Sequence, residues 1–173
     1  MRAWIGTRAH ERGERFNQTV LEHVRKLGLS ARARVLMSEL GVPEHAGNFR
    51  QSDIDVLAWS TATGLVMLIE CKRLLFAKTI GEIADQLNDF RMGRDPSGKN
   101  NLERHVERFH WLDVNRTGLE RITGIPASTM KLKPLIVTSR TVPMQFVVSL
   151  PDVAHDITSL DNLSGWLSKI QCS

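Results

Sequence analysis

Residues 52–74 read SDIDVLAWSTATGLVMLIECKRL, two apolar segments on either side of a short polar loop. Ile54–Trp59 and Leu65–Cys71 are rich in residues that favour β-strands, and the loop Thr61–Gly64 ends in glycine. Two such segments joined by a short loop with glycine are typical of a β-hairpin. We therefore predict an antiparallel hairpin.

Charged residues lie at the open end of this hairpin. Counting outward from a four-residue loop places Asp55 opposite Glu70, and Asp53 opposite Lys72. Like charges directly opposite each other are destabilising, and alternate residues such as Glu70 and Lys72 share one face of a strand. A fold keeps two carboxylates together most readily when a cation lies between them, and oxygen ligands suit Mg²⁺. The hairpin thus predicts a magnesium site, in which Mn²⁺ is expected to substitute.

The spacing of these charges resembles a known signature. Asp55, fourteen intervening residues and then Glu70-Cys71-Lys72 are similar to the D…(D/E)-x-K pattern of the PD-(D/E)XK, or restriction-endonuclease-like, nuclease superfamily. The resemblance runs from about Arg12 to Arg140 and is nearest to the nuclease-related-domain and methylated-DNA-restriction branches. It implies an α/β (α+β) fold, in which a mixed β-sheet of about four to five strands is flanked by helices.

The resemblance also implies a role for each residue of the signature. Asp55 and Glu70 bind the metal together with the main-chain carbonyl of Cys71, and Lys72 lies beside the attacking water. The proline that precedes the first acid in the superfamily is absent, which leaves Asp53 in competition with Asp55. The hairpin count favours Asp55, because it is the residue placed against Glu70.

Two helices next to the hairpin carry further candidates. His10–Leu27 has apolar residues at helical spacing, and its G-E opening resembles that of nuclease-related domains, where a helix glutamate completes the acidic cluster. Glu14 is the first candidate for this role and Glu22 the second. The helix predicted from Thr79 to about Met92 begins with a capping box and contains Gln86, which resembles a Q-x-x-x-(Y/F) element that binds phosphate or metal-bound water. The competing interpretation of the two glutamates is that they are solvated charges on the helix surface. The competing interpretation of Gln86 is a surface side chain without a function.

The remaining pattern completes one domain over residues 1–173, with its core at about 10–150. The expected elements are a first strand at Ala33–Leu40, a helix at Asn101–Asn115, strands at Leu132–Ser139 and Phe146–Leu150, and a C-terminal helix at Ser159–Ile170. His105 is interpreted as a histidine on the surface or one whose hydrogen bonds are satisfied. Arg108 is interpreted as part of a solvated charged face. Gly93–Asn100 is one residue short of a phosphate-binding P-loop and follows a helix instead of a strand, so we expect no nucleotide there.

Composition narrows the classes of function. The 173 residues are 42% hydrophobic and 24% charged, which is ordinary for a globular domain, and the net charge of +4 is compatible with nucleic acid. The two cysteines favour no disulfide framework and hence a reducing cytoplasm. No apolar run approaches the roughly 20 residues of a membrane span, and we expect no membrane partner.

These observations favour a Mg²⁺-dependent deoxyribonuclease, an endonuclease or an exonuclease, with DNA as partner and RNA left open. A homodimer is compatible with this function, because restriction-type enzymes often dimerise to cut both strands. The alternative is a catalytically inactive nuclease fold that binds nucleic acid or protein. In that case Lys72 forms a structural salt bridge with Glu70 or Asp53.

Overall fold

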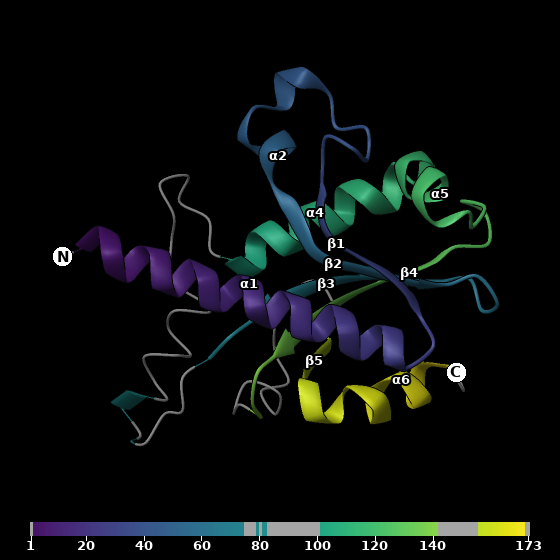
Figure 1. Ribbon diagram of the computed structural model, residues 1–173. Coiled ribbons are helices and arrows are strands. Elements are labelled where there is room, and N and C mark those ends of the chain that lie inside the picture. Colours follow the sequence, from purple (N-terminus) through teal and green to yellow (C-terminus); the bar gives the residue numbers. More distant parts are fainter. Residues whose placement is uncertain (1, 75–78, 80, 83–100, 142–155, 172–173) are drawn as a thin grey trace.

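A single mixed β-sheet organises the part of the chain that the structure describes. The structure is a computed structural model, and it describes residues 2–74, 79, 81–82, 101–141 and 156–171. Within these residues the order is α1 (Arg2–Lys26), β1 (Ser30–Leu36), the 3₁₀ turn η1 (Glu44–Ala46), α2 (Asn48–Gln51), β2 (Asp53–Ser60), β3 (Leu65–Lys72), α4 (Asn101–Val114), α5 (Thr117–Thr123), β4 (Lys131–Thr138), β5 (Asp156–Ser159), η3 (Leu160–Asn162) and α6 (Leu163–Gln171) (Figure 1).

The sheet has five strands in the order β1-β2-β3-β4-β5. β1, β2 and β3 are antiparallel neighbours, whereas β4 is parallel to β3 and β5 is parallel to β4. A parallel neighbour requires a long crossover, and α4 and α5 lie in the connection between β3 and β4. The predicted α+β class, with a mixed sheet flanked by helices, is confirmed.

The predicted hairpin has the predicted register. Ser60 pairs with Leu65 across the loop Thr61–Gly64, and the pairing continues in step to Val56 and Ile69. A glycine occupies the last position of the loop, Gly64, because the φ there is +71°. Residues with a Cβ rarely adopt this conformation. This register brings Asp55, Glu70 and Lys72 to the same end of the hairpin.

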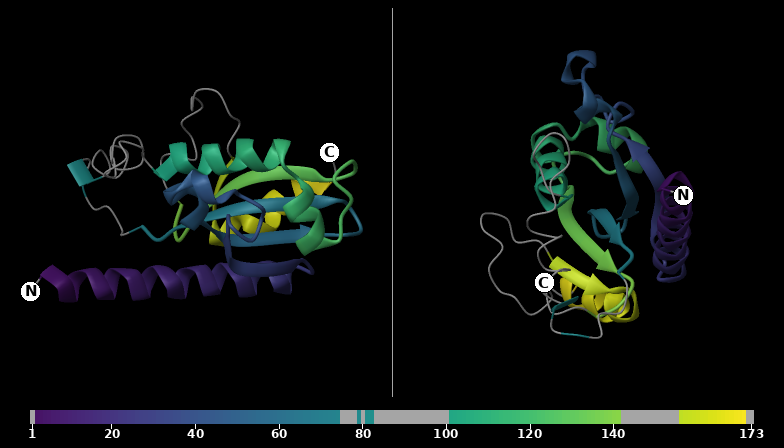
Figure 2. Two further views of the ribbon diagram at one scale, coloured as in Figure 1. Left: turned by 90° about the horizontal axis from the view of Figure 1, so that it is seen from above. Right: turned by 90° about the vertical axis from the view of Figure 1, so that its left-hand side faces the viewer.

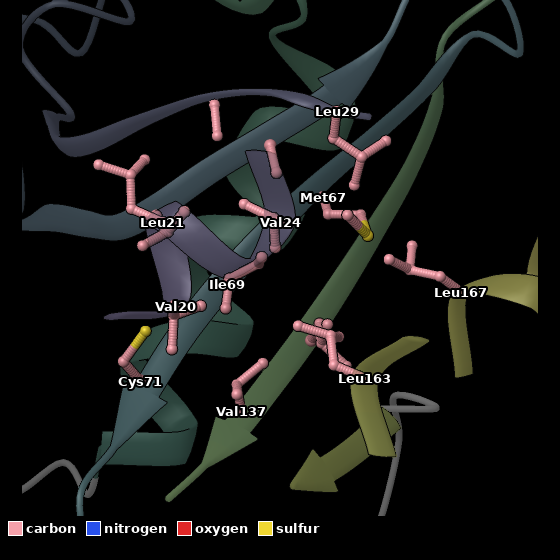
Figure 3. Packing of buried hydrophobic residues seen from close by; sticks show 14 of the residues in the cluster. Val20, Leu21, Val24, Leu29, Met67, Ile69, Cys71, Val137, Leu163 and Leu167 are labelled. Carbon is pink, nitrogen blue, oxygen red and sulfur yellow. The ribbon is translucent and has the colours of Figure 1, made fainter. Parts of the chain in front are cut away.

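Helices cover both faces of the sheet. α1 and α6 pack on one face, where the buried residues of α1 meet those of β3, β4 and α6 (Figures 2 and 3). The labelled members of this layer are Val20, Leu21, Val24, Leu29, Met67, Ile69, Cys71, Val137, Leu163 and Leu167. α4 and α5 cover the opposite face, through a second cluster that includes Leu57, Leu68, Leu112 and Leu119. The two-layer burial explains why β3 is apolar almost throughout, since a central strand is covered on both sides.

The alternation of faces breaks next to Asp55. Ala33 and Val56 are paired and pack in the layer under α1, but the pair two residues further along the ladder, Val35 and Ile54, packs in the layer under α4. Arg34 lies between them with a φ of +52°. A non-glycine residue in this conformation costs of order 1–3 kcal/mol and is found most often at functional sites. The break re-aims the side chains at the point where the predicted acids lie.

Several predicted boundaries differ from the observed ones. The first helix begins at Arg2 instead of His10, and the first strand ends at Leu36 because Met37–Gly41 forms a turn. α2, α5 and β5 were not predicted, and the C-terminal helix begins at Leu163 after the 3₁₀ turn η3. The strand predicted at Phe146–Leu150 lies outside the described residues.

Candidate active site

Asp55 lies between the sheet and α1. Its Oδ2 accepts a hydrogen bond from the main-chain N–H of Cys71 at 2.8 Å, and its Oδ1 accepts one from the Asn17 side chain at 3.2 Å. The ladder between β2 and β3 runs from Ser60 and Leu65 to Val56 and Ile69, and Asp55 and Glu70 are the next residues along each strand. The aspartate is therefore held by contacts to β3 on one side and to α1 on the other.

Glu70 lies on the α4 side of the sheet, in a cluster of cations. Its Oε1 is 2.7 Å from Lys72 Nζ, and its Oε2 is 2.6 Å from Arg108 Nη2 and 3.9 Å from His105 Nδ1. Glu70, Arg108 and His105 are each at most 8% exposed. Lys72 reaches this group from two residues further along the same strand, which follows from the period-two alternation of side chains.

The two carboxyl groups have opposite electrostatic surroundings. Burial raises the pKa of Asp55 to about 7, the charge of Glu70 adds to the rise, and the hydrogen bond from Cys71 and the charge of Lys72 oppose it. Burial also acts to raise the pKa of Glu70, but Lys72, Arg108 and His105 outweigh it and lower that pKa to about 2. Glu70 is thus a permanent anion, while Asp55 changes its charge near neutral pH.

The secondary acidic candidates lie further out. Glu14 on α1 and Asp53 on β2 both contact Arg34, at 3.5 Å and 3.6 Å. Arg34 therefore bridges the two acids that were considered beside Asp55. Glu22 is exposed, and its carboxylate accepts a hydrogen bond from Gln18. Of the two glutamates, Glu14 is the one for which the structure gives a link to the site, because its partner Arg34 also holds Asp53 two residues from Asp55.

Two sequence predictions fall at the edge of the described residues or beyond it. The capping box predicted at Thr79 is present, since Thr79 and Glu82 exchange side-chain-to-backbone hydrogen bonds of 3.2 Å in both directions. Gln86 and the loop Gly93–Asn100 lie outside the described residues.

Asp55 and Glu70 are the two carboxylates that the sequence predicts as ligands of a magnesium ion. No group of three or more histidine, cysteine, aspartate or glutamate side chains within the described ranges is arranged to hold a metal. Mg²⁺ is commonly held by one or two carboxylates and otherwise by water and substrate phosphate. Asp55 is half-buried, and burial and the charge of Glu70 raise its pKa, so a cation would stabilise this group in its charged form. The oxygen donors of Asp55, Glu70 and the Cys71 carbonyl are of the chemical kind that Mg²⁺ takes, while Lys72 and Arg108 already contact Glu70.

Arg108, His105 and Asn17 are site residues that the sequence did not indicate. The interpretation of Arg108 as part of a solvated face is wrong, because it is 7% exposed and bound to Glu70. His105, only 1% exposed, is a buried member of the same cluster. The single signal available was their spacing of one helical turn, three residues apart on α4, which places both on one face.

The fold is that of an α+β protein with a five-stranded mixed sheet, and Asp55, Glu70 and Lys72 belong to its central hairpin. The model of the anti-phage protein Upx-like family matches residues 1–162, and the chain belongs to this family. No curated protein and no solved structure matches the chain. None of the described helices combines the length and the apolar character that crossing a membrane requires.

Proposed function

We propose that the protein is a metal-dependent nuclease that hydrolyses DNA phosphodiester bonds at Asp55, Glu70 and Lys72. The observation that carries this proposal is that the half-buried Asp55, the buried Glu70 and Lys72 lie at one end of the hairpin. Asp55 is tied to the backbone of Cys71, and Glu70 is 2.7 Å from Lys72. Membership of an anti-phage family is consistent with a nucleic-acid target, because phage DNA is a substrate that a defence protein can destroy.

Asp55, Glu70 and the main-chain carbonyl of Cys71 would hold the ion. A bound Mg²⁺ supplies a Lewis acid that polarises the phosphate and lowers the pKa of a water molecule. The main-chain N–H of Cys71 donates a hydrogen bond to the carboxylate of Asp55. The carboxylate and the Cys71 carbonyl are therefore positioned by the same residue of β3. Glu14, through Arg34, would support the acidic side of the site, and Gln86 stays a predicted contact to water or phosphate.

Lys72 would act on the reacting groups. Its side chain is 20% exposed, which leaves it accessible to a substrate that approaches from solvent. A cation at this point stabilises the negative charge that develops on the phosphate and orients the attacking water. Glu70 holds the ammonium group in place through the 2.7 Å contact, so this carboxylate serves both the metal and the lysine.

A second candidate function is a nuclease fold without chemistry that binds nucleic acid or protein. The observation that favours it is the ion-pair cluster around Glu70, in which Lys72 and Arg108 each contact one of its oxygens. A buried carboxylate with two cationic partners is stable without a metal. The two candidates differ in whether a divalent ion binds and whether DNA is cut.

The test is incubation of the purified protein with plasmid, linear duplex and single-stranded DNA, with and without Mn²⁺ or Mg²⁺. We expect metal-dependent cleavage by the wild type and loss of most cleavage in Lys72→Ala, by about 100-fold or more, because a charge that stabilises the transition state is removed. Lys133→Ala, which alters an exposed lysine of β4, is the matched control and should cut like the wild type.

Thermal unfolding of the same preparations separates chemistry from structure. Lys72→Ala should stay folded, since Arg108 still neutralises Glu70. A variant that melts lower yet cuts normally once folded would assign Lys72 a structural role instead. Absence of cleavage of all three DNA forms by folded wild-type protein with either metal would favour the binding module.

A further inference from the structure

Arg108 has an unusual position for an arginine in a helix next to an acidic site. It lies on α4, 38 residues along the chain from Glu70, and its Nη2 donates a buried hydrogen bond of 2.6 Å to Glu70 Oε2. The residue is 7% exposed, so Glu70 compensates its charge and water contributes little. The catalytic roles proposed above make no use of it.

The contact between Arg108 and Glu70 joins two opposite charges, but it lacks the second hydrogen bond that a guanidinium group can form with a carboxylate. A structural arginine usually forms a two-pronged pair with a carboxylate, through two parallel N–H donors. Here Lys72 occupies the other carboxylate oxygen, and the contact runs from Nη2 to Oε2. Arg108 Nε is buried and has no hydrogen-bond partner among the residues that the structure describes. A buried donor without a partner carries a desolvation penalty, which favours any rearrangement that satisfies it.

The charges around Glu70 also oppose a metal ion. Lys72 and Arg108 already place two cations against this carboxylate, and a divalent ion bound there would be added beside them. Like charges repel strongly at buried positions, where solvent screens them least. Metal binding and the Arg108 contact are therefore in competition for the same carboxylate.

We propose that Arg108 is a built-in counter-ion of this site, whose guanidinium group occupies Glu70 in the metal-free protein and competes with a divalent cation for it. Arg108 is thus a positioning residue that sets how much free metal the site requires. The inference rests on the proposed function, because it takes Asp55 and Glu70 to be metal ligands. It goes beyond that function by assigning a residue outside the nuclease signature a regulatory role.

The test is calorimetric titration of Mn²⁺ into the wild type, Arg108→Gln and Arg32→Gln, each checked for folding by circular dichroism. Arg108→Gln keeps a hydrogen-bond donor and removes the charge. We expect its Mn²⁺ affinity to rise by about tenfold or more, the effect of one nearby charge on a buried ion. Arg32→Gln is the matched control, because it removes an arginine from an exposed pair with Glu39, and its affinity should equal that of the wild type.

The possible results separate the inference from the proposed function. Tighter binding by Arg108→Gln, or binding by this variant alone, supports the inference. Equal or weaker binding in a folded Arg108→Gln, beside a wild type that binds, overturns the inference and leaves the metal site in place. Failure of both folded proteins to bind Mn²⁺ overturns the metal-dependent function, and the inference with it.

A measurement on the wild type decides the matter if Arg108→Gln does not fold. The guanidinium nitrogen resonances of Arg108, assigned by their loss in Arg108→Lys, can be followed by nuclear magnetic resonance during addition of diamagnetic Mg²⁺. We expect these resonances to shift as the contact with Glu70 is released. Unchanged Arg108 resonances at saturating Mg²⁺ would overturn the inference.

Discussion

The carboxyl group of Asp55 gives the protein an unusual dependence of stability on pH. Burial, followed by the charge of Glu70, raises the pKa of Asp55 from 3.8 to about 7 in the folded protein. The folded state then binds a proton that the unfolded chain has released, so the free energy of unfolding falls as pH rises through this interval. Glu70 has the opposite sign: its pKa of about 2 provides stability that is present above pH 4.5 and is lost toward pH 2.

We predict that the metal-free wild type loses stability between pH 4.5 and 7, by about 1 kcal/mol per pH unit. Asp55→Asn should remove this dependence and be the more stable protein at pH 8, because the amide carries no charge to bury. Denaturant unfolding at several pH values, with a chelator present, measures the difference between the two proteins. Glu22→Gln, which changes an exposed acid, should behave as the wild type. Parallel pH curves for wild type and Asp55→Asn would show that Asp55 ionises normally.

Local and distant contacts explain what the sequence could predict at the residue scale. Asp55, Glu70 and Lys72 belong to one hairpin, so a count of residues across the loop is enough to bring them together. Arg108 meets Glu70 across 38 residues of chain, and no periodicity in the sequence encodes that distance. The roles of Glu14 and Gln86 were taken from the family resemblance, and they stay predictions.

At the scale of elements, the long helices and strands with a clear pattern could be predicted from the sequence, and the short ones could not. The hairpin and the helices α1, α4 and α6 have a clear alternating or helical pattern, and all of them were predicted, with boundary differences of up to eight residues at Arg2. α2, α5 and β5 have four, seven and four residues, too few for a period to emerge. Their formation depends on packing with distant segments, as α5 illustrates.

α5 is packed against the turn after β1 through Gly118. A Cβ on this residue would lie 2.0 Å from the main-chain oxygen of Leu40, so no side chain fits without movement of backbone. We predict that Gly118→Ala destabilises the protein by about 3 kcal/mol, the scale of overpacking in a core. Gly165→Ala on α6 is the matched control, because no atom lies within 4 Å of its added Cβ.

The control should be neutral or stabilising by roughly 0.5–1 kcal/mol, since alanine favours a helix more than glycine does. Thermal or denaturant unfolding of the two variants measures both effects. Equal stability of Gly118→Ala and the wild type would contradict the close contact between α5 and Leu40.

At the scale of the whole molecule, the site lies where both helical layers meet the sheet. Asn17 reaches Asp55 from α1, and Arg108 reaches Glu70 from α4 on the opposite face. Figure 2 shows these two helices on opposite sides of the sheet. The centre therefore requires the assembled fold, and neither layer alone provides it.

The family assignment makes a prediction for the whole protein in cells. If the proposed chemistry underlies defence, expression of the wild type in a phage-sensitive bacterium should reduce plaque formation, whereas Asp55→Asn and Lys72→Ala should not. Glu22→Gln, expressed at the same level, should protect as the wild type does. Full protection by both site variants would separate the anti-phage activity from these residues.

The most direct test of the central claim is calorimetric titration of Mn²⁺ into the wild type, Asp55→Asn and Asp53→Asn. Asp55 and Glu70 directly follow the last hairpin pair, Val56 and Ile69, while Asp53 contacts Arg34 at 3.6 Å. We predict binding by the wild type, loss of about 100-fold or more in affinity for Asp55→Asn, and little change for Asp53→Asn, because only the former removes a carboxylate that is proposed to hold the ion together with Glu70. Full affinity in Asp55→Asn together with loss in Asp53→Asn would contradict the assignment of the site.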